Sequence, residues 1–413
     1  MNLSIPYGNK TIELTLPSGI AVDTVRYRDR PAADAVRCIR GALDRPIGTP
    51  RLREIARGRR DAVILISDIT RLCPSHLFLP SLLDELNAGG IGDERIRIVV
   101  ALGMHRKQTE TELRRLVGEG VYRRVAVANH SALREDCVRL GVTKLGTPVE
   151  INRTVAQADL RIATGNIEPH GLAGVSGGVK ALVPGVASQA CIEHNHALSQ
   201  RFRTEAGAPD NEIRRDMEEA LTFVPVDFLF NVIVNHRREV MAAVAGDVVA
   251  AHRAGARIAH SLFVVPSAKT YDAVLASAGG HPKDIQLYQA IKSVVNASRL
   301  VKPGGSLLMA ARCEELYGNG TLQQWVETIR DPRRIVSMLQ QNFVLGPHKV
   351  EHLDRVLRHC RVFLYSDAPP AIVELLGLEL VDDLQRQAEE LFSDRTKSYA
   401  FMPFAAITFP QVR

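Results

Sequence analysis

Hydrophobic residues recur along the chain in short runs, each followed by a polar or glycine-rich loop and then by a helical pattern. The runs Asp61–Ile66 and Arg95–Leu102 are apolar enough to predict strands buried on both faces. The helix after the second run begins with Thr109-x-x-Glu112, the pattern of a capping box. Further elements are expected as strands at Val125–Ala128 and Leu160–Ala163 and as a helix at His76–Leu86. Strands that alternate with helices are typical of a largely parallel sheet covered by helices.

The pattern changes after a charged helix at Asn211–Leu221. Phe228–Val234 and Val240–Val244 predict the two strands of a hairpin, and a helix at Asp247–His260 leads out of the first domain. The second series comprises a strand at Ala273–Ala278, a helix at Lys283–Ala297, a turn at Pro303–Gly305 and a strand at Ser306–Ala311. We therefore predict an α/β protein of two domains with mostly parallel sheets, residues 1–265 and residues 266–413, and an active site in the cleft between them.

Composition narrows the class of protein. Of 413 residues, 46% are hydrophobic and 24% are charged, which is ordinary for a globular chain. The net charge is +6, aromatic residues make up only 5%, and we interpret the arginine cluster Arg51–Arg60 as a solvated helix face. We therefore expect no nucleic-acid partner. No apolar run approaches the roughly 20 residues of a membrane helix.

The expected location is the cytoplasm. The first nineteen residues alternate like a strand hairpin and lack the pattern of a secretory signal. The six cysteines are far apart and form no C-x-x-C pair, which is typical of buried thiols in a reducing compartment.

Unusual polar residues follow the predicted strands. Asp68 and Arg71 come after the first strand, His105 after the second, and His170 after the strand that ends at Ala163. In open α/β sheets, ligands bind beyond the carboxyl ends of the strands, so these loops should converge. A single histidine in such a loop is more often a surface or capping residue. Two histidines that converge favour proton transfer near neutral pH.

The segment Gly165–Ser188 contains six glycines around His170, Ser176 and Lys180. Closely spaced glycines allow backbone N–H groups to approach an anion, and a following lysine can meet a phosphate or act as a nucleophilic amine. The segment is not a P-loop, because Lys180 is followed by alanine. A tight structural turn is the alternative, but six glycines with histidine, serine and lysine make it the weaker interpretation.

Ligands for a metal and for a carboxylate are less clear from the residues alone. His194 and His196 form an H-N-H pattern, which is either an exposed turn or a source of one imidazole ligand. No second ligand follows at a conventional spacing, so a cofactor would have to supply the rest. Arg71 and Lys292 are candidates for binding a carboxylate, and Gln289 lies one helical turn from Lys292. The alternative for Lys292 is a solvated helix lysine.

Together these segments resemble the nickel-dependent lactate racemases, and the resemblance spans nearly the whole chain. The residues that carry it are Asp68-Ile-Thr-Arg71, Gly103-Met-His105-Arg106, Asn129-His130, Pro169-His170, Ala173-Gly174-x-Ser176-Gly-Gly178-x-Lys180, Asn195-His196, Gly279-Gly280-x-Pro282-Lys283-Asp284 and Tyr288-Gln289-x-x-Lys292. The resemblance implies two α/β domains with the active site between them.

The resemblance also implies a cofactor, the nickel-pincer nucleotide (pyridinium-3,5-bisthiocarboxylic acid mononucleotide nickel complex). It would be attached covalently to Lys180, with His196 rather than His194 as the protein ligand of nickel. Ser176, Gly177 and Gly178 would hold its phosphate. Separate biosynthesis proteins would assemble the cofactor and are therefore expected partners.

The implied activity is the racemisation or epimerisation of a small 2-hydroxycarboxylic acid by proton-coupled hydride transfer to this cofactor. His105 and His170 would exchange the hydroxyl proton. Arg71, Gln289 and Lys292 would bind the substrate, and Asp68 would orient Arg71 or contact the cofactor.

One departure leaves the substrate open. The family often has proline after the arginine of its D-x-T-R motif, whereas this chain has Leu72 and then Cys73. The alternatives are an oxidoreductase that releases the keto acid and a nucleotide-binding or sensing protein without turnover. The presence of His105, His170 and Lys180 favours an enzyme.

Overall fold

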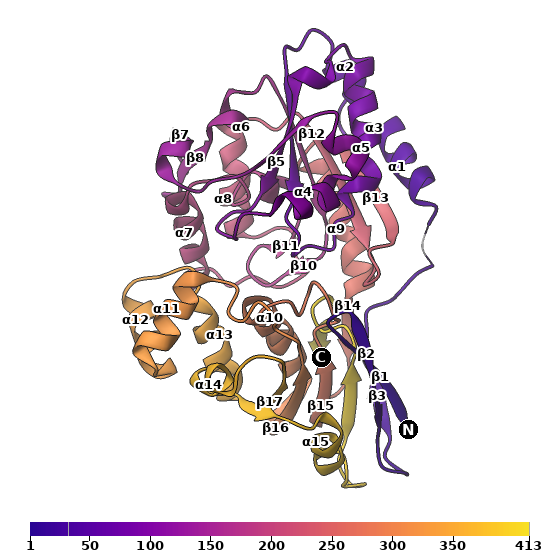
Figure 1. Ribbon diagram of the computed structural model, residues 1–413, viewed down its shortest axis with the longest axis vertical. Helices are drawn as coiled ribbons and strands as arrows, with labels where there is room; N and C mark the ends of the chain where they lie inside the picture. Colours follow the sequence, from indigo (N-terminus) through magenta and orange to yellow (C-terminus); the bar gives the residue numbers. More distant parts are fainter. Residues whose placement is uncertain (32, 413) are drawn as a thin grey trace. The chain divides into compact units, whose positions relative to one another are not determined.

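The computed structural model of the chain describes residues 1–31 and 33–412. The chain divides into two compact units (Figure 1). We call Asp29–Ser261 the middle unit, and Met1–Arg28 together with Leu262–Arg413 the terminal unit. Each unit contains a six-stranded sheet whose strands are mostly parallel. The predicted α/β fold class is therefore confirmed.

The sheet of the middle unit has the strand order β13-β12-β9-β4-β5-β6. All neighbours are parallel except β12 and β13, which form the predicted hairpin. The strands are β4 (Ala62–Ser67), β5 (Ile96–Ala101), β6 (Ala126–Asn129), β9 (Leu160–Asn166), β12 (Phe228–Val234) and β13 (Val240–Gly246). β9 runs three residues beyond the predicted end at Ala163, because Thr164, Gly165 and Asn166 continue the parallel pairing with β12. The Thr164 hydroxyl, which is buried, donates to the Leu65 carbonyl.

Helices and small strands complete the middle unit (Figure 1). They are α1 (Ala35–Asp44), α2 (Leu52–Ile55), α3 (Ser75–Ala88), α4 (Glu110–Val117), α5 (Glu119–Tyr122), α6 (Arg153–Gln157), α7 (Gln189–Ala197), α8 (Glu212–Glu219), α9 (Ala250–Phe263), β7 (Cys137–Val142), β8 (Pro148–Asn152), β10 (Pro169–His170) and β11 (Gly174–Val175). The predicted capping box of α4 is confirmed, since the Thr109 hydroxyl accepts from the Glu112 N–H and the Glu112 carboxylate accepts from the Thr109 N–H.

The arginine cluster differs from a simple solvated face. Arg51 and Arg53 both bind Glu85, whose side chain is only 5% exposed. Arg59 binds Asp159 and Asp227. Arg51 and Arg53 therefore tie α2 to α3, and Arg59 ties the loop after α2 to the residues that precede β9 and β12. Within the described residues, no helix has the length and apolar character needed to cross a membrane.

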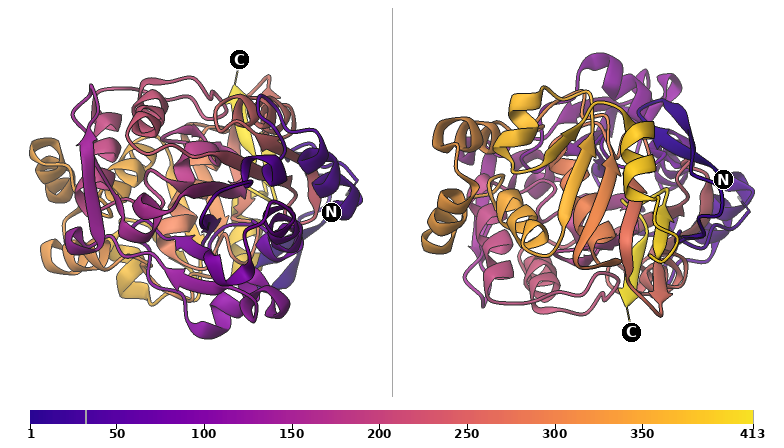
Figure 2. Two further views of the ribbon diagram at one scale, coloured as in Figure 1. Left: turned by 90° about the horizontal axis from the view of Figure 1, so that it is seen from above. Right: turned by 90° about the horizontal axis from the view of Figure 1, so that it is seen from below.

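The sheet of the terminal unit is parallel throughout, with the order β18-β17-β16-β15-β19-β3. Its strands are β3 (Val22–Thr24), β15 (Tyr271–Ser277), β16 (Val301–Ala310), β17 (Arg361–Tyr365), β18 (Glu379–Val381) and β19 (Tyr399–Met402). Several of them lie side by side, orange to yellow, in the right-hand view of Figure 2. The predicted turn Pro303–Gly305 lies inside β16. The register with β15 shifts there, because Tyr271 pairs with Val301 and Ala273 pairs with Ser306.

Residues of β15 alternate between two apolar layers. Val274 and Ala276 pack with α10 (Leu287–Ser298) and its neighbours, whereas Ala273 and Leu275 face the opposite layer. The remaining elements are α11 (Gly320–Ile329), α12 (Pro332–Gln341), α13 (His348–Leu357), α14 (Pro370–Leu375), α15 (Leu384–Leu391) and the parallel pair β14 (Val264–Ser267) and β20 (Phe409–Val412).

The N-terminal hairpin, β1 (Asn2–Tyr7) and β2 (Lys10–Thr15), covers the second of these layers. Ile5 is fully buried there, in one cluster with Leu275 and Leu308. The structure thus groups the first 28 residues with the C-terminal residues, whereas the sequence analysis placed them in the domain 1–265. Periodicity identifies the buried face of a hairpin. It does not show against which sheet this face packs when the strands of that sheet are more than 200 residues away in the sequence.

We predict that Ile5→Ala destabilises the terminal unit by about 2–5 kcal/mol, because it leaves a cavity between the hairpin and the sheet. Hydrogen exchange followed by mass spectrometry should show lost protection in peptides of β1, β15 and β16. Thr11→Ala, on an exposed position of the same hairpin, is the control and should leave exchange unchanged. Lost protection confined to β4 and β9 would contradict the grouping.

Candidate functional site

Asp68, which is buried, and His105, which is partly exposed, form a hydrogen-bonded pair after the ends of β4 and β5. The Asp68 carboxylate, 3% exposed, lies 3.0 Å from His105 Nδ1 and also accepts from the Thr70 N–H at 2.8 Å. Burial alone would raise the pKa of Asp68, but the His105 imidazole, Arg71 and the Thr70 hydroxyl outweigh it and hold the pKa below its usual value. Since an ionised carboxylate only accepts, His105 Nδ1 carries the proton and Nε2 presents a lone pair.

Arg71 belongs to the same cluster. Its Nε lies 3.9 Å from the Asp68 carboxylate, and its side chain is 25% exposed. The backbone N–H of Arg71 donates to the Asp68 carbonyl, which makes a tight turn after β4. Asp68 thus lies within ion-pair distance of Arg71 and hydrogen-bonds to His105. The expectation that Asp68 orients Arg71 or contacts the cofactor stays a prediction.

His170 and Lys180 form a second pair. His170 Nε2 lies 3.3 Å from Lys180 Nζ. His170 Nδ1 accepts from the backbone N–H groups of Leu172 and Ala173, at 3.1 and 3.2 Å. A nitrogen that accepts cannot carry the proton, so the neutral ring of His170 has its proton on Nε2.

Sheet topology brings the two pairs to one region of the middle unit. β4 and β9 are adjacent and parallel, so the loops that follow them leave the same edge of the sheet. The Gly103 N–H, in the loop before His105, donates to the Gly185 carbonyl at 2.8 Å. The Gly185 N–H donates in turn to the Lys180 carbonyl at 3.0 Å. The loop of His105 therefore lies against the turn that carries Lys180.

The glycine-rich loop is fixed by the protein's own polar groups. The Ser176 hydroxyl donates to the Asn166 carbonyl and accepts from the Glu168 N–H. The Gly178 N–H donates to the Asn231 side chain at 2.8 Å, and Gly177 has a φ of +71°. The role of Ser176, Gly177 and Gly178 toward a phosphate therefore remains a prediction, since two of these three already have internal partners.

His196 and His194 differ in what their rings bind. His196, on α7, has its Nδ1 at 2.9 Å from the Ile192 carbonyl, so Nδ1 donates and the lone pair is on Nε2. This is how a metal-ligating imidazole is usually oriented. His194 uses Nε2 itself, at 3.1 Å from the Leu145 carbonyl. The pattern fits His196 rather than His194 as a ligand.

The described residues of the middle unit do not form a complete metal site of their own. No three histidine, cysteine, aspartate or glutamate side chains are grouped for metal binding anywhere in residues 1–31 and 33–412. A metal near His196 would need further donors from a bound molecule.

Cys73, in the loop after Arg71, is buried, and burial raises the pKa of its thiol to about 12.

Gln289 and Lys292 lie on α10 of the terminal unit. The Gln289 side-chain oxygen accepts from Lys292 Nζ at 2.7 Å, whereas its Nε2 is buried without a hydrogen-bond partner in the described part of the chain. Lys292 and Lys349 lie 5.7 and 5.1 Å from the centroid of the Tyr288 ring. An unsatisfied donor beside two ammonium groups suits an anion. Whether these residues join those of the middle unit at one substrate remains a prediction.

Sequence reasoning missed several residues that hold the site. Lys349 carried only a weak signal, a His-Lys pair directly after Gly-Pro. Arg214 and His252, fully buried on α8 and α9, donate to carbonyls of the glycine-rich loop from 39 and 76 residues away, so no local pattern reveals them. His130 proves structural: its Nε2 donates to the Ala187 carbonyl, and burial lowers its pKa to about 4.

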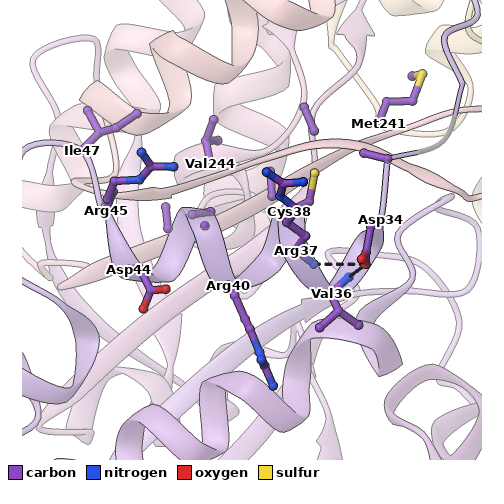
Figure 3. Close-up of a pocket in the computed structure, with 16 residues that line it drawn as sticks. Asp34, Val36, Arg37, Cys38, Arg40, Asp44, Arg45, Ile47, Met241 and Val244 are labelled. Atoms are coloured by element: carbon purple, nitrogen blue, oxygen red, sulfur yellow. Dashed lines mark hydrogen bonds between the residues drawn. The ribbon is translucent and has the colours of Figure 1, made fainter.

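A groove of about 1020 Å³ lies elsewhere on the middle unit, between α1 and β13 (Figure 3). Its two acidic residues already have partners, since Asp34 caps α1 and Asp44 pairs with Arg51. The described residues that line it include none of the predicted site residues. The candidate site is therefore at the strand ends and not in this groove.

A mostly parallel sheet that carries two imidazoles and an amine on loops at neighbouring strand ends has the layout of an α/β enzyme. Residues 7–207 match the lactate racemase N-terminal domain, and residues 266–400 match the lactate racemase C-terminal domain. The chain belongs to the lactate racemase family. The predicted family and the predicted enzyme class, an isomerase, are thus confirmed.

Two relatives and one solved structure document this membership. A lactate racemase of Thermoanaerobacterium thermosaccharolyticum is 31% identical over 380 residues, covering 89% of this chain and 88% of that protein. A lactate racemase of Lactiplantibacillus plantarum is 30% identical over 410 residues, covering 95% of each. The structure of the lactate racemase apoprotein from T. thermosaccharolyticum is similar over the full length of both chains, with a TM-score of 0.89 and 28% identity.

The glycine-rich loop gives a testable consequence. A Cβ atom on Gly174, whose φ is +72°, would lie 1.8 Å from the Ala208 carbonyl oxygen, whereas one on Gly171 would meet nothing within 4 Å. We predict that Gly174→Ala lowers the free energy of unfolding by about 2–4 kcal/mol, because backbone must move. Gly171→Ala, the matched control, should change it by less than about 0.5 kcal/mol. Urea titration measures both, and equal effects would contradict the loop conformation.

Proposed function

We propose that this chain racemises or epimerises a small 2-hydroxycarboxylic acid, with His105 and His170 as its acid–base pair. The observation that carries the proposal is the opposite hydrogen bonding of the two rings. His105 donates through Nδ1 to Asp68, so its Nε2 is a base. In the neutral ring, His170 accepts through Nδ1 from two backbone N–H groups and carries its proton on Nε2. The two rings therefore present different groups through Nε2, a lone pair at His105 and an N–H donor at His170.

The proton steps follow from these assignments. His105 Nε2 takes the proton of the substrate hydroxyl group as the Cα–H bond breaks, and the Asp68 carboxylate stabilises the imidazolium that forms. When the second enantiomer forms, His170 donates a proton from Nε2 as an imidazolium, which requires that the Leu172 and Ala173 N–H groups no longer point at its Nδ1. In the reverse direction, His170 is the base and His105 the acid. Because the two rings come from different loops, each serves one face of the planar keto acid.

The residues present fit the nickel-pincer nucleotide. Lys180 supplies an amine for the covalent attachment, and His196 supplies one imidazole whose lone pair is on Nε2. The chemistry that this cofactor supplies when bound is reversible acceptance of a hydride. His196 would supply one ligand to the nickel, and the cofactor would have to supply the others. Proteins that assemble the cofactor would be partners of this chain.

Substrate binding is assigned to three residues. The Arg71 guanidinium, oriented by Asp68, would bind the substrate carboxylate, and Lys292 with Gln289 would add charge and an N–H donor. Both relatives are lactate racemases, which supports lactate as one candidate substrate. Leu72 and Cys73 follow Arg71 directly and are both buried. They do not show which side chain the hydroxy acid substrate carries.

We predict that His105→Gln and His170→Gln each lower the racemisation rate of the loaded enzyme by about 10²–10⁴-fold, because each removes one proton carrier. Chiral chromatography of single-enantiomer hydroxy acids measures the rate. The wild type should interconvert enantiomers with no external electron acceptor. Stoichiometric keto acid would instead indicate an oxidoreductase, and full activity in both variants would contradict the acid–base assignment.

The attachment of the cofactor can be tested separately by mass. In protein made with its cofactor-assembly partners, Lys180→Ala should lose the covalent adduct in the intact mass spectrum. His196→Ala should keep the adduct but lose most of the nickel. His194→Ala is the matched control and should keep both, since its ring binds the Leu145 carbonyl. An adduct on Lys180→Ala would show that the attachment site is wrong.

A further inference from the structure

The hydrogen bonds of His170 restrict the protonation states that the pair His170–Lys180 can adopt. His170 Nδ1 is occupied by the N–H groups of Leu172 and Ala173. If Lys180 were an ammonium donating to Nε2, the ring proton would have to move to Nδ1 and point at these two donors. An imidazolium would present the same clash. Only a His170 Nε2–H that donates to a neutral Lys180 amine satisfies all three contacts.

The surroundings of Lys180 also disfavour an ammonium. Arg214 is fully buried beneath the loop, where it donates to the carbonyls of Ala173 and Val175, and its Nη1 has no hydrogen-bond partner in the described part of the chain. Burial lowers the pKa of Arg214 only to about 10, so it keeps its charge. A buried cation nearby is one of the ways in which proteins keep a lysine unprotonated.

His252 shows that these charges share one neighbourhood. Its Nε2 donates to the Ser176 carbonyl at 2.8 Å. Its pKa lies well below the usual value, first because of burial and then because of Arg214, Arg253 and Lys180. Arg253 itself is paired with Glu218.

The acidic groups at the neighbouring strand ends have partners of their own. Asp68 accepts from Thr70 and His105, and Glu168 accepts from the Asn166 side chain. Their charges oppose the effect of the arginines, but both carboxylates are already engaged in these contacts.

We infer that His170 has a second role, before catalysis: in the unloaded protein it holds Lys180 as a free-base amine ready for acylation, and acylation of Lys180 then releases the His170 Nε2–H toward the substrate. Acylation forms an N–C bond, expels the leaving group of the acyl donor and sends the amine proton to solvent. The resulting amide-type nitrogen has no basic lone pair, so it no longer accepts from His170. The release step rests on the proposed function, whereas the free-base state does not.

The test uses the unloaded full-length protein and acetic anhydride, a small acylating probe. Pulse acetylation at a series of pH values, followed by peptide mass spectrometry, gives a rate for each lysine relative to its own plateau at high pH. The exposed Lys144 is the internal reference. An ordinary lysine has a midpoint near pH 10.4. The midpoint of Lys180 should lie at least about one pH unit lower, a tenfold larger neutral fraction at pH 7.

Two substitutions separate the role of His170 from that of Arg214. His170→Gln offers an amide N–H to the amine and should keep the low midpoint, whereas His170→Leu should move it toward that of Lys144. If both variants keep the low midpoint, the arginines alone account for it and the inference about His170 is wrong.

A measurement on the wild type decides the question if His170→Leu does not fold. The imidazole ¹⁵N shifts of His170 in the unloaded protein should show a neutral ring with its proton on Nε2 from pH 6 to 8. An imidazolium, or a proton on Nδ1, would overturn the inference. Neither result affects the mass measurement on Lys180→Ala. The inference about His170 can therefore be wrong while the proposed attachment to Lys180 is right, and the reverse.

Discussion

The candidate site depends on what the Nδ1 atoms of two histidines bind. At His105 this atom faces a buried, ionised carboxylate, and at His170 it faces two backbone N–H groups. Each contact fixes which ring nitrogen carries the proton, and the two contacts fix it in opposite ways. The group that each neutral ring presents through Nε2 is thus set by hydrogen bonds to its Nδ1, away from the nitrogen that would react.

The scaffold explains why these contacts are rigid. β4, β5 and β9 are adjacent parallel strands, so the loops after them leave one edge of the sheet. Their short length leaves little freedom: Asp68 follows β4 directly, and the Gly103 N–H locks the loop of His105 to the turn of Lys180 through Gly185. Arg214 on α8 and His252 on α9, which are both buried, donate hydrogen bonds to carbonyls of the glycine-rich loop. The sheet supplies position, and the helices supply the fixed charges.

Much of this was predictable from the sequence, and the failures have physical causes. Apolar runs located the strands of both sheets, because a parallel strand buried on both faces leaves a strong local pattern. The same reasoning could not assign residues 1–28, whose partner strands are distant in sequence. It named His105, His170 and Lys180 from their places after strands and glycines. It could not derive their protonation, which depends on backbone N–H groups, nor find Arg214, which acts from a separate helix.

The shared proton of His170 and Lys180 links the two states of the enzyme. A catalytic imidazole that donates to an amine is not available to a substrate, so the unloaded protein has one of its two proton carriers engaged. Converting the amine to an amide removes the acceptor without adding charge beside Arg214, whereas an ammonium would add it. The attachment of a cofactor at this position would therefore do more than retain it. It would complete the acid–base pair, so that a chain without its cofactor would lack part of its proton-transfer apparatus as well.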